Sequence, residues 1–275
     1  MNVRAVGLLI SANFEFMRLY FDSKTFIETS EGMDISMPLS TNPHATSAWY
    51  CEPVKIEPVV TANFVGDVNQ GGSVNFRNVF LNPHGNGTHT ECVGHISKEY
   101  ITINQCLREF HFKALVITVK PETFYNEDFK ENDLIITRTL LERAWTEAKK
   151  TTDADIKALV IRTLDNSDEK LKHNYSNTNP PYLQSDAIQF IIESRIDHLI
   201  IDLPSVDREN DHGKLAAHHL FWNYPQDPQL HRTITELVYV PDYIKDGLYF
   251  LNIQITSLEN DASPSKLVLF EIQTI

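Results

Sequence analysis

The chain has 275 residues, of which 37 are acidic and 24 basic, so its formal net charge is −13. A chain of this charge repels phosphate groups, and we therefore expect neither nucleic acid nor an anionic membrane surface as a partner. With 42% hydrophobic residues, 10 glycines and 13 prolines, the composition is typical of a globular protein with a substantial core, not of a disordered or collagen-like chain.

The three cysteines, Cys51, Cys92 and Cys106, are an odd number and have no CxxC spacing. A disulfide framework is not expected, and a reducing compartment is the default interpretation. The N-terminal run over residues 3–10 is apolar but short, and we interpret it as a strand rather than a signal peptide. No run approaches the ~18 apolar residues that a membrane span needs, so we expect a cytoplasmic protein.

In chain order, the segment 30–90 is rich in Pro, Asn and Gly and predicts strands and loops with little helix. Beyond it, short runs of branched apolar residues predict buried strands at 113–119, 133–138, 157–163 and 198–203. Helical periodicity follows at 140–150, 185–195 and 213–222, with Ser185 as the expected N-cap of its helix. This alternation of strand and helix predicts α/β units with partly parallel strands.

The C-terminal residues 247–275 read as two strands joined by a polar turn, which predicts a hairpin that closes the fold. Composition shows no linker at which the chain would divide. We therefore expect one domain, residues 1–275.

The densest group of chemically active side chains is the stretch Pro83–His95, "PHGNGTHTECVGH". If it is extended, His89, Glu91 and His95 face the same side, and two ligands ~7 Å apart along a strand can converge on one ion. Imidazole and carboxylate together suit zinc, manganese or iron. His84 lies beyond the glycine turn, which could bend it back to the same point. The alternative is a glycine turn with histidines at the surface.

A second group, His212, His218 and His219, lies on or beside the helix predicted at 213–222. On a helix, one of the adjacent pair His218 and His219 can point inward while the other points away. The alternative for this pair is a polar helix face beside a packed Trp222.

These two groups, in this order, resemble the cyclase-like metal-dependent hydrolase family, which includes kynurenine formamidases and isatin hydrolase. The family signature is His-x-Gly-Thr-His-x-Asp-x-Pro-x-His, and its core is similar to Gly87-Thr88-His89-x-Glu91-x-x-x-His95. Five further segments look like family segments and extend the resemblance over about residues 32–240: "GMDISMPLS" (32–40), "ALVIRT" (158–163), "LIIDLPSVD" (199–207), "HH" (218–219) and "TELV" (235–238).

The resemblance implies a mixed central β-sheet or barrel-like β core flanked by helices, a swivelling β/β/α-like fold. It also implies a divalent cation, zinc or manganese, as one or two ions. Its ligands would be His84, His89, Glu91, His218 and Glu236, with Glu91 bridging if two ions bind. His95 would be the general acid and base, near the metal but not on it.

The chain departs from the signature at three places. The first histidine of the signature would fall at Gly85, and His84 lies one residue earlier. Glu91 replaces the aspartate, and Val93 replaces the proline. His84 is therefore expected to be a ligand only if the turn differs by one residue. The segment 223–232 looks like an insertion, which we expect near the mouth of the site.

The implied activity is hydrolysis of an amide, formamide or lactam by a metal-activated water, with a small-molecule substrate and a homodimer or higher homo-oligomer. Trp49, Tyr50 and Trp222 are candidates to line the pocket. Within enzymes, the rival is a cysteine hydrolase with Cys92 as nucleophile and His95 as base, although Cys92 would face away from His95 on a strand. The rival from another class is a non-catalytic metal-binding or interaction protein of the same fold.

Overall fold

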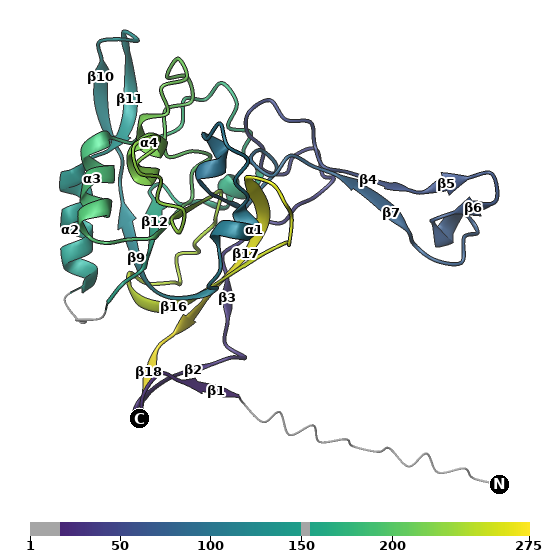
Figure 1. The fold of residues 1–275 in the computed structure, drawn as a ribbon, viewed down its shortest axis with the longest axis horizontal. Helices are drawn as coiled ribbons and strands as arrows, with labels where there is room; N and C mark the ends of the chain where they lie inside the picture. The colour runs from purple at the N-terminus through teal and green to yellow at the C-terminus, as the bar shows by residue number, and fades with distance from the viewer. Residues whose placement is uncertain (1–16, 150–154) are drawn as a thin grey trace.

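The computed structural model describes residues 17–149 and 155–275. The strand predicted over 3–10 lies outside the described residues. In the part that is described, seven strands close into a mixed barrel in the order β16-β9-β12-β14-β15-β8-β17, because β17 also pairs with β16 (Figure 1). The prediction of a mixed, barrel-like β core flanked by helices is confirmed.

The barrel strands are β8 (His89–Glu91), β9 (His111–Val119), β12 (Ala158–Thr163), β14 (His198–Ile201), β15 (Thr233–Glu236), β16 (Gly247–Ile255) and β17 (Ala262–Glu271). A short strand β3 (Met33–Asp34) adds to β17. Strands β9, β12, β14 and β15 run parallel to one another. Strands β12 and β14 lie within the apolar runs predicted at 157–163 and 198–203, and β9 contains the run predicted at 113–119, whereas β15 was not among the predicted apolar runs. Every residue of β12 and β14 is buried, as expected for parallel strands covered on both faces.

The helices are α1 (Ile103–Cys106), α2 (Arg138–Lys149), α3 (Ser185–Glu193) and α4 (Ala216–Trp222). Helices α2 and α3 lie side by side along one side of the barrel (Figure 1). They supply the crossover connections that parallel strands require. The three long predicted helices are thus confirmed.

The predicted N-cap of one helix and the predicted start of another are wrong. Ser185 is the first helical residue and not the cap, because the backbone N–H of Gln184 still donates to the Ile136 carbonyl and holds Gln184 extended. The helix expected from residue 213 begins at 216. There the Asp211 carboxylate accepts hydrogen bonds from the backbone N–H groups of Gly213 and Lys214, which folds this stretch into a turn.

Smaller sheets surround the barrel. Strands β1 (Arg18–Tyr20), β2 (Thr25–Glu28) and β18 (Gln273–Thr274) form one; β10 (Glu122–Asn126), β11 (Glu131–Ile136) and β13 (Tyr182–Leu183) form another. Strands β4 (Lys55–Pro58), β5 (Val60–Thr61), β6 (Phe64–Val65) and β7 (Arg77–Phe80) build an arm, residues 55–80, that projects from the body (Figure 1). This agrees with the prediction of strands and loops between 30 and 90.

The predicted C-terminal hairpin is formed by β16 and β17, which close the barrel against β9 and β8. Within residues 17–149 and 155–275, none of the helices has the length and apolar character needed to cross a membrane.

The prediction that the segment 223–232 lies at the mouth of the site is wrong. Its His231 contacts Asp197, which directly precedes β14, with Nε2 and Oδ1 3.2 Å apart. Glu236 ends β15, which runs parallel to β14, so the segment and Glu236 lie at opposite ends of these strands.

Candidate metal centre

The segment that carries the histidines folds as a short strand followed by a 3-10 turn. His89 and Glu91 belong to β8 and have no exposed surface, because β15 and β17 pair with β8 on its two sides. The prediction that strand alternation places His95 on the same side as His89 and Glu91 is wrong, because the chain leaves the strand after Glu91. The turn Val93–His95 instead returns the His95 ring to the same place, with Nδ1 3.8 Å from Glu91 Oε2.

Two groups of possible ligand atoms share Glu91. His84, Glu91 and His95 form one, and His89, Glu91 and Glu236 form the other; the ligand atoms within each group lie within 4.8 Å of one another. Across the β8–β15 pair, His89 Nε2 is 3.4 Å from Glu236 Oε2. All six predicted site residues therefore meet in one cluster, because His218 also reaches it.

Helix α4 directs one of its two adjacent histidines into the cluster and the other away from it. His218 is buried, and its Nε2 lies 3.0 Å from Glu91 Oε1. His219 turns away, and its Nδ1 donates to the Tyr224 carbonyl instead. The Asp207 carboxylate accepts the Nδ1–H of His218 at 2.6 Å and also two backbone N–H groups of the first turn of α4, which fixes this helix against the site.

The one-residue displacement of His84 has a steric cause. A side chain at position 85 would place its Cβ 2.3 Å from Cys51 Sγ and 2.8 Å from the Ala48 carbonyl oxygen, so only glycine fits there. His84 reaches the cluster from the neighbouring position, with Nδ1 3.0 Å from Glu91 Oε2. The altered turn that the sequence left open is thus present.

The donor set fits a divalent cation. His89 Nδ1–H donates to the Gly87 carbonyl at 3.0 Å, which leaves Nε2 as a lone pair facing the cluster. This Nε2 and Glu91 Oε2 are both buried without a hydrogen-bond partner. A buried polar atom left unpaired costs about 1–3 kcal/mol, so their convergence beside further imidazoles and a carboxylate is what a cation site requires.

The electrostatics lead to the same conclusion. Burial alone would raise the pKa of Glu91, but the nearby imidazoles of His95, His218 and His84 hold it well below its ordinary value. Burial likewise opposes charge on His84, yet Asp261 and Glu91 raise the pKa of this imidazole to about 10. The carboxylates thus favour positive charge at this point, and a cation would compete with protons for the same lone pairs.

A cavity of about 310 Å³ opens beside the cluster. Its lining includes Trp49, as predicted, together with Cys51, Asn82 and Ser205. The same prediction is wrong for the other two aromatic residues. Tyr50 is 68% exposed, and Trp222 is fully buried beneath His218, with the two ring centroids 5.3 Å apart.

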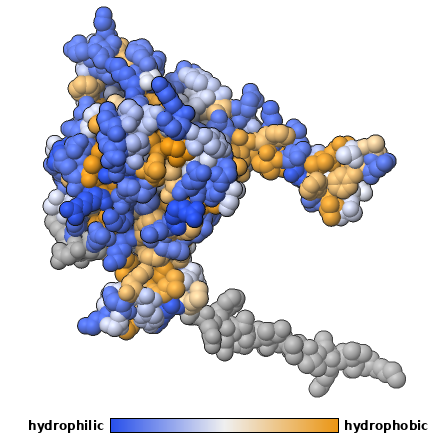
Figure 2. All heavy atoms as spheres, in the orientation of Figure 1, coloured by the Kyte–Doolittle hydropathy of each residue, from blue (hydrophilic) through white to orange (hydrophobic). Residues whose placement is uncertain are grey.

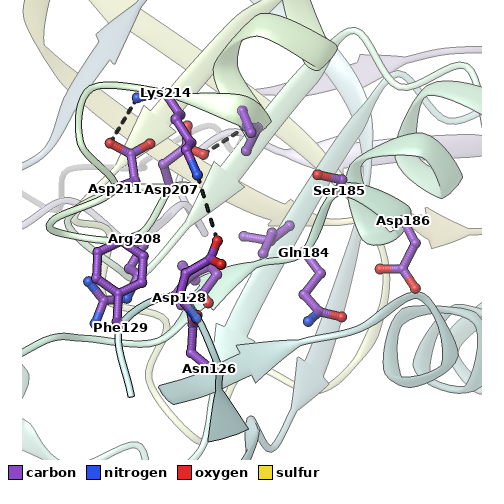
Figure 3. A pocket seen from close by; sticks show the side chains of 14 residues that line it. Asn126, Asp128, Phe129, Gln184, Ser185, Asp186, Asp207, Arg208, Asp211 and Lys214 are labelled. Carbon is purple, nitrogen blue, oxygen red and sulfur yellow. Dashed lines mark hydrogen bonds and ion pairs between the residues drawn. The ribbon is translucent and has the colours of Figure 1, made fainter. Parts of the chain in front are cut away.

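Arg208 lines this cavity and also a neighbouring one of about 420 Å³, where it lies against Phe129 (Figure 3). Its guanidinium is already engaged: Nε donates to Asp133 Oδ2 at 3.0 Å, a further contact goes to Glu131, and the Phe129 ring centre lies 3.9 Å away. This arginine is therefore not free to bind an anionic ligand in either cavity.

Two carboxylates at the site were not predicted from the sequence. Asp207 stands at the end of a segment quoted for the resemblance, but its contact with His218 was not foreseen. Asp261 lies in the turn between β16 and β17, 170 residues beyond Glu91, and its side chain contacts His84 and His95. Its local sequence indicates only a polar turn, so the closure of the barrel alone reveals it.

A family model described as "Putative cyclase" matches residues 33–208, which is more than half of the chain. No curated protein matches the sequence. Among solved structures, a potential metal-dependent hydrolase with cyclase activity has a TM-score of 0.58 at 15% identity, covering 88% of this chain and 98% of the other.

Isatin hydrolases are similar in the same way. Isatin hydrolase A from Labrenzia aggregata, bound to benzyl benzoate, has a TM-score of 0.61 at 15% identity and covers 87% of this chain and 93% of its own. An isatin hydrolase bound to the product analogue thioisatinate has a TM-score of 0.59 at 18% identity, with coverages of 88% and 92%. At these identities the likeness is one of fold.

The carboxylate that holds Arg208 makes stability depend on pH in the acid range. Burial raises the pKa of Asp133, but donors led by Arg208 outweigh it and lower the pKa from 3.8 to about 2. A lowered pKa stabilises the fold above 3.8, and this contribution is lost as the pH falls towards 2. We expect Asp133→Asn to lower the free energy of unfolding by about 3–5 kcal/mol at neutral pH and by less near pH 2.

Urea unfolding between pH 7 and pH 2.5, with chelator present, measures this difference. Asp128→Asn is the matched control, because Asp128 is exposed and its ion pair with Lys214 is long, at 3.8 Å. We expect this variant to change the free energy of unfolding by no more than about 0.5 kcal/mol. An Asp133→Asn effect that is equally large at pH 2.5 and pH 7 would contradict the assignment.

Proposed function

The chain belongs to the putative cyclase family, and on that premise we propose that it is a metal-dependent hydrolase that cleaves an amide, formamide or lactam bond. The observation that carries this proposal is the convergence of buried imidazoles and carboxylates around Glu91. Within this cluster, His89 Nε2 and Glu91 Oε2 lack any hydrogen-bond partner. A fold shared with metal-dependent hydrolases and isatin hydrolases supports it.

We assign His84, His89, Glu91, His218 and Glu236 as the residues that hold zinc or manganese. Glu91 turns Oε2 towards His84 and Oε1 towards His218, so one carboxylate can serve two ions. Elemental analysis of the metal-loaded chain determines whether one or two ions bind and whether the metal is zinc or manganese.

When bound, a divalent cation lowers the pKa of water to near neutrality and polarises a carbonyl oxygen. The residues of the chain supply the proton transfers and the positioning. We propose that His95 removes the proton from the attacking water and returns it to the leaving nitrogen, a role that suits imidazole because it exchanges protons near neutral pH. His95 lies at the cavity, partly exposed, while the assigned ligands His89 and His218 are buried.

The residues that line the cavity favour binding of an uncharged substrate with an aromatic or cyclic amide group. Trp49 offers a flat apolar surface, and Asn82 and Ser205 offer neutral polar groups, whereas Arg208 is held by acidic side chains. Isatin, the substrate in the names of two similar structures, is a cyclic amide, and an aryl formamide fits the same description. The arylformamidase-like activity is the finer form of the proposal.

The rival enzyme mechanism has no support in the structure. Cys92 is fully buried in the core, and the neighbouring Cys106 together with burial raises the pKa of its thiol. A non-catalytic metal-binding or interaction protein of the same fold is the second candidate, since Glu91 is one methylene longer than the aspartate of the signature. It predicts metal binding without turnover.

We further propose a cytoplasmic, single-domain chain, residues 1–275, that forms a homodimer or a higher homo-oligomer. Apolar side chains cover the projecting arm (Figure 2), where Val60 and Val79 are 65% and 57% exposed. Exposed apolar surface of this kind marks protein contacts. A wild-type chain that is monomeric in sedimentation velocity would contradict the oligomer.

The first test is metal content. After supplementation with zinc or manganese and removal of the excess, we expect one to two ions per chain by elemental analysis. His218→Ala should lower the metal affinity by at least 10-fold because it removes a ligand, while His219→Ala, which changes the adjacent histidine that faces away, should leave it unchanged. Less than a tenth of an equivalent in the wild-type chain would contradict the metal site.

The second test separates His95 from the ligands. We expect His95→Ala to lower kcat by about 10²–10⁴-fold on the best substrate from a screen of aryl formamides, isatin-like lactams and simple lactones, because it removes the proton carrier. Its metal content should stay that of the wild type. Unchanged turnover would exclude the acid–base role, loss of metal would make His95 a ligand, and a metal-loaded wild type without turnover across the screen would favour the non-catalytic candidate.

A further inference from the structure

Asp261 is held against the strand that carries Glu91. It immediately precedes β17, whose first residue, Ala262, lies opposite Glu91 in the antiparallel pair. The Asp261 backbone carbonyl accepts a hydrogen bond from the Cys92 N–H at 3.1 Å, which continues the pairing by one step. The position of its side chain is therefore fixed by the same sheet that fixes the proposed ligands.

One oxygen of Asp261 contacts two histidines. Oδ2 lies 2.9 Å from His84 Nε2 and 3.3 Å from His95 Nδ1, and the two rings stand 4.3 Å apart between their centroids. A carboxylate only accepts, so each imidazole donates its N–H to it. In the neutral form of each ring, the lone pair is then on Nδ1 of His84, which faces Glu91, and on Nε2 of His95.

The other two histidines of the cluster have outer partners of the same kind. His218 donates Nδ1–H to Asp207 at 2.6 Å, and His89 donates Nδ1–H to the Gly87 carbonyl at 3.0 Å. Such partners orient metal-binding imidazoles and select their tautomer. Asp261 is the outer partner of His84, and it differs from the others because it also holds His95.

We propose that Asp261 is a positioning residue that fixes the ring and tautomer of His84 for metal binding and of His95 for proton transfer. This inference rests on the proposed metal-dependent hydrolase function. It goes further by making the C-terminal hairpin, which lies beyond the matched segment 33–208, a functional part of the site.

A purely structural role in the hairpin belongs to a different carboxylate. Glu259, two residues earlier, accepts hydrogen bonds from Thr102 and Asn104 at the start of α1 and touches none of the histidines. Glu259→Gln therefore weakens the attachment of the same hairpin without changing the cluster, which makes it the matched control.

The experiment measures the affinity of the full chain for Zn²⁺ by competition with a chromophoric chelator. We expect Asp261→Ala and the isosteric Asp261→Asn to weaken Zn²⁺ binding by about 10–100-fold. Asp261→Glu should restore part of the affinity, and Glu259→Gln should bind as the wild type does. If the alanine variant does not fold, the asparagine variant carries the comparison.

A second measurement determines the tautomer of His95 and does not depend on turnover. Long-range ¹H–¹⁵N spectra of the zinc-loaded chain should show the Nδ1–H tautomer of His95 in the wild type and in Glu259→Gln, and its loss in Asp261→Asn. Wild-type affinity and an unchanged tautomer in Asp261→Asn would overturn the role of Asp261 while leaving the metal site intact. Failure of the wild type itself to bind Zn²⁺ would overturn the proposed function and this inference with it.

Discussion

The complete burial of the Glu91 carboxylate is the constraint on which the rest of the structure depends. A charge withdrawn from water in the barrel wall is strongly unfavourable unless opposite charge and hydrogen bonds surround it. Glu91 has no exposed surface, and it is met by His84 on one oxygen and His218 on the other. A bound cation would complete this arrangement, because Oε2 has no hydrogen-bond partner of its own.

The barrel provides the geometry for this burial. Strand β8 is only three residues long, but β15 and β17 pair with it on both sides, and each neighbour brings an acidic residue to the cluster. From β15 comes Glu236, opposite His89, and from the turn before β17 comes Asp261. Helix α4 then brings His218, held by Asp207. Segments from several parts of the chain therefore assemble one site.

The sequence predicted those features that depend on local periodicity. Three of the four parallel strands, β9, β12 and β14, and the three long helices follow from apolar runs and 3.6-residue spacing, and the placing of His89 and Glu91 on one face follows from strand alternation. The resemblance then brought His218 and Glu236 to the same site, although no local pattern connects them. Where helices begin was predicted less well, because backbone bonds such as that of Gln184 to Ile136 depend on the neighbouring strand.

Features set by tertiary contacts could not be read from the sequence. The turn that admits His84 depends on Cys51 occupying the space beside Gly85, and nothing near position 85 shows this. Asp261 lies near the histidines only because the barrel closes. The place of the segment 223–232 was misjudged for a related reason: the direction of β15 decides which end of the barrel it occupies.

The metal site at Glu91 is tested most directly by anomalous diffraction at the zinc edge from crystals of the full chain grown with zinc. We predict a peak at about 2.0–2.2 Å from a Glu91 carboxylate oxygen, with histidine nitrogens and Glu236 completing the shell. A map with no anomalous peak at Glu91, and with the carboxylate bonded only to the surrounding histidines, would contradict it.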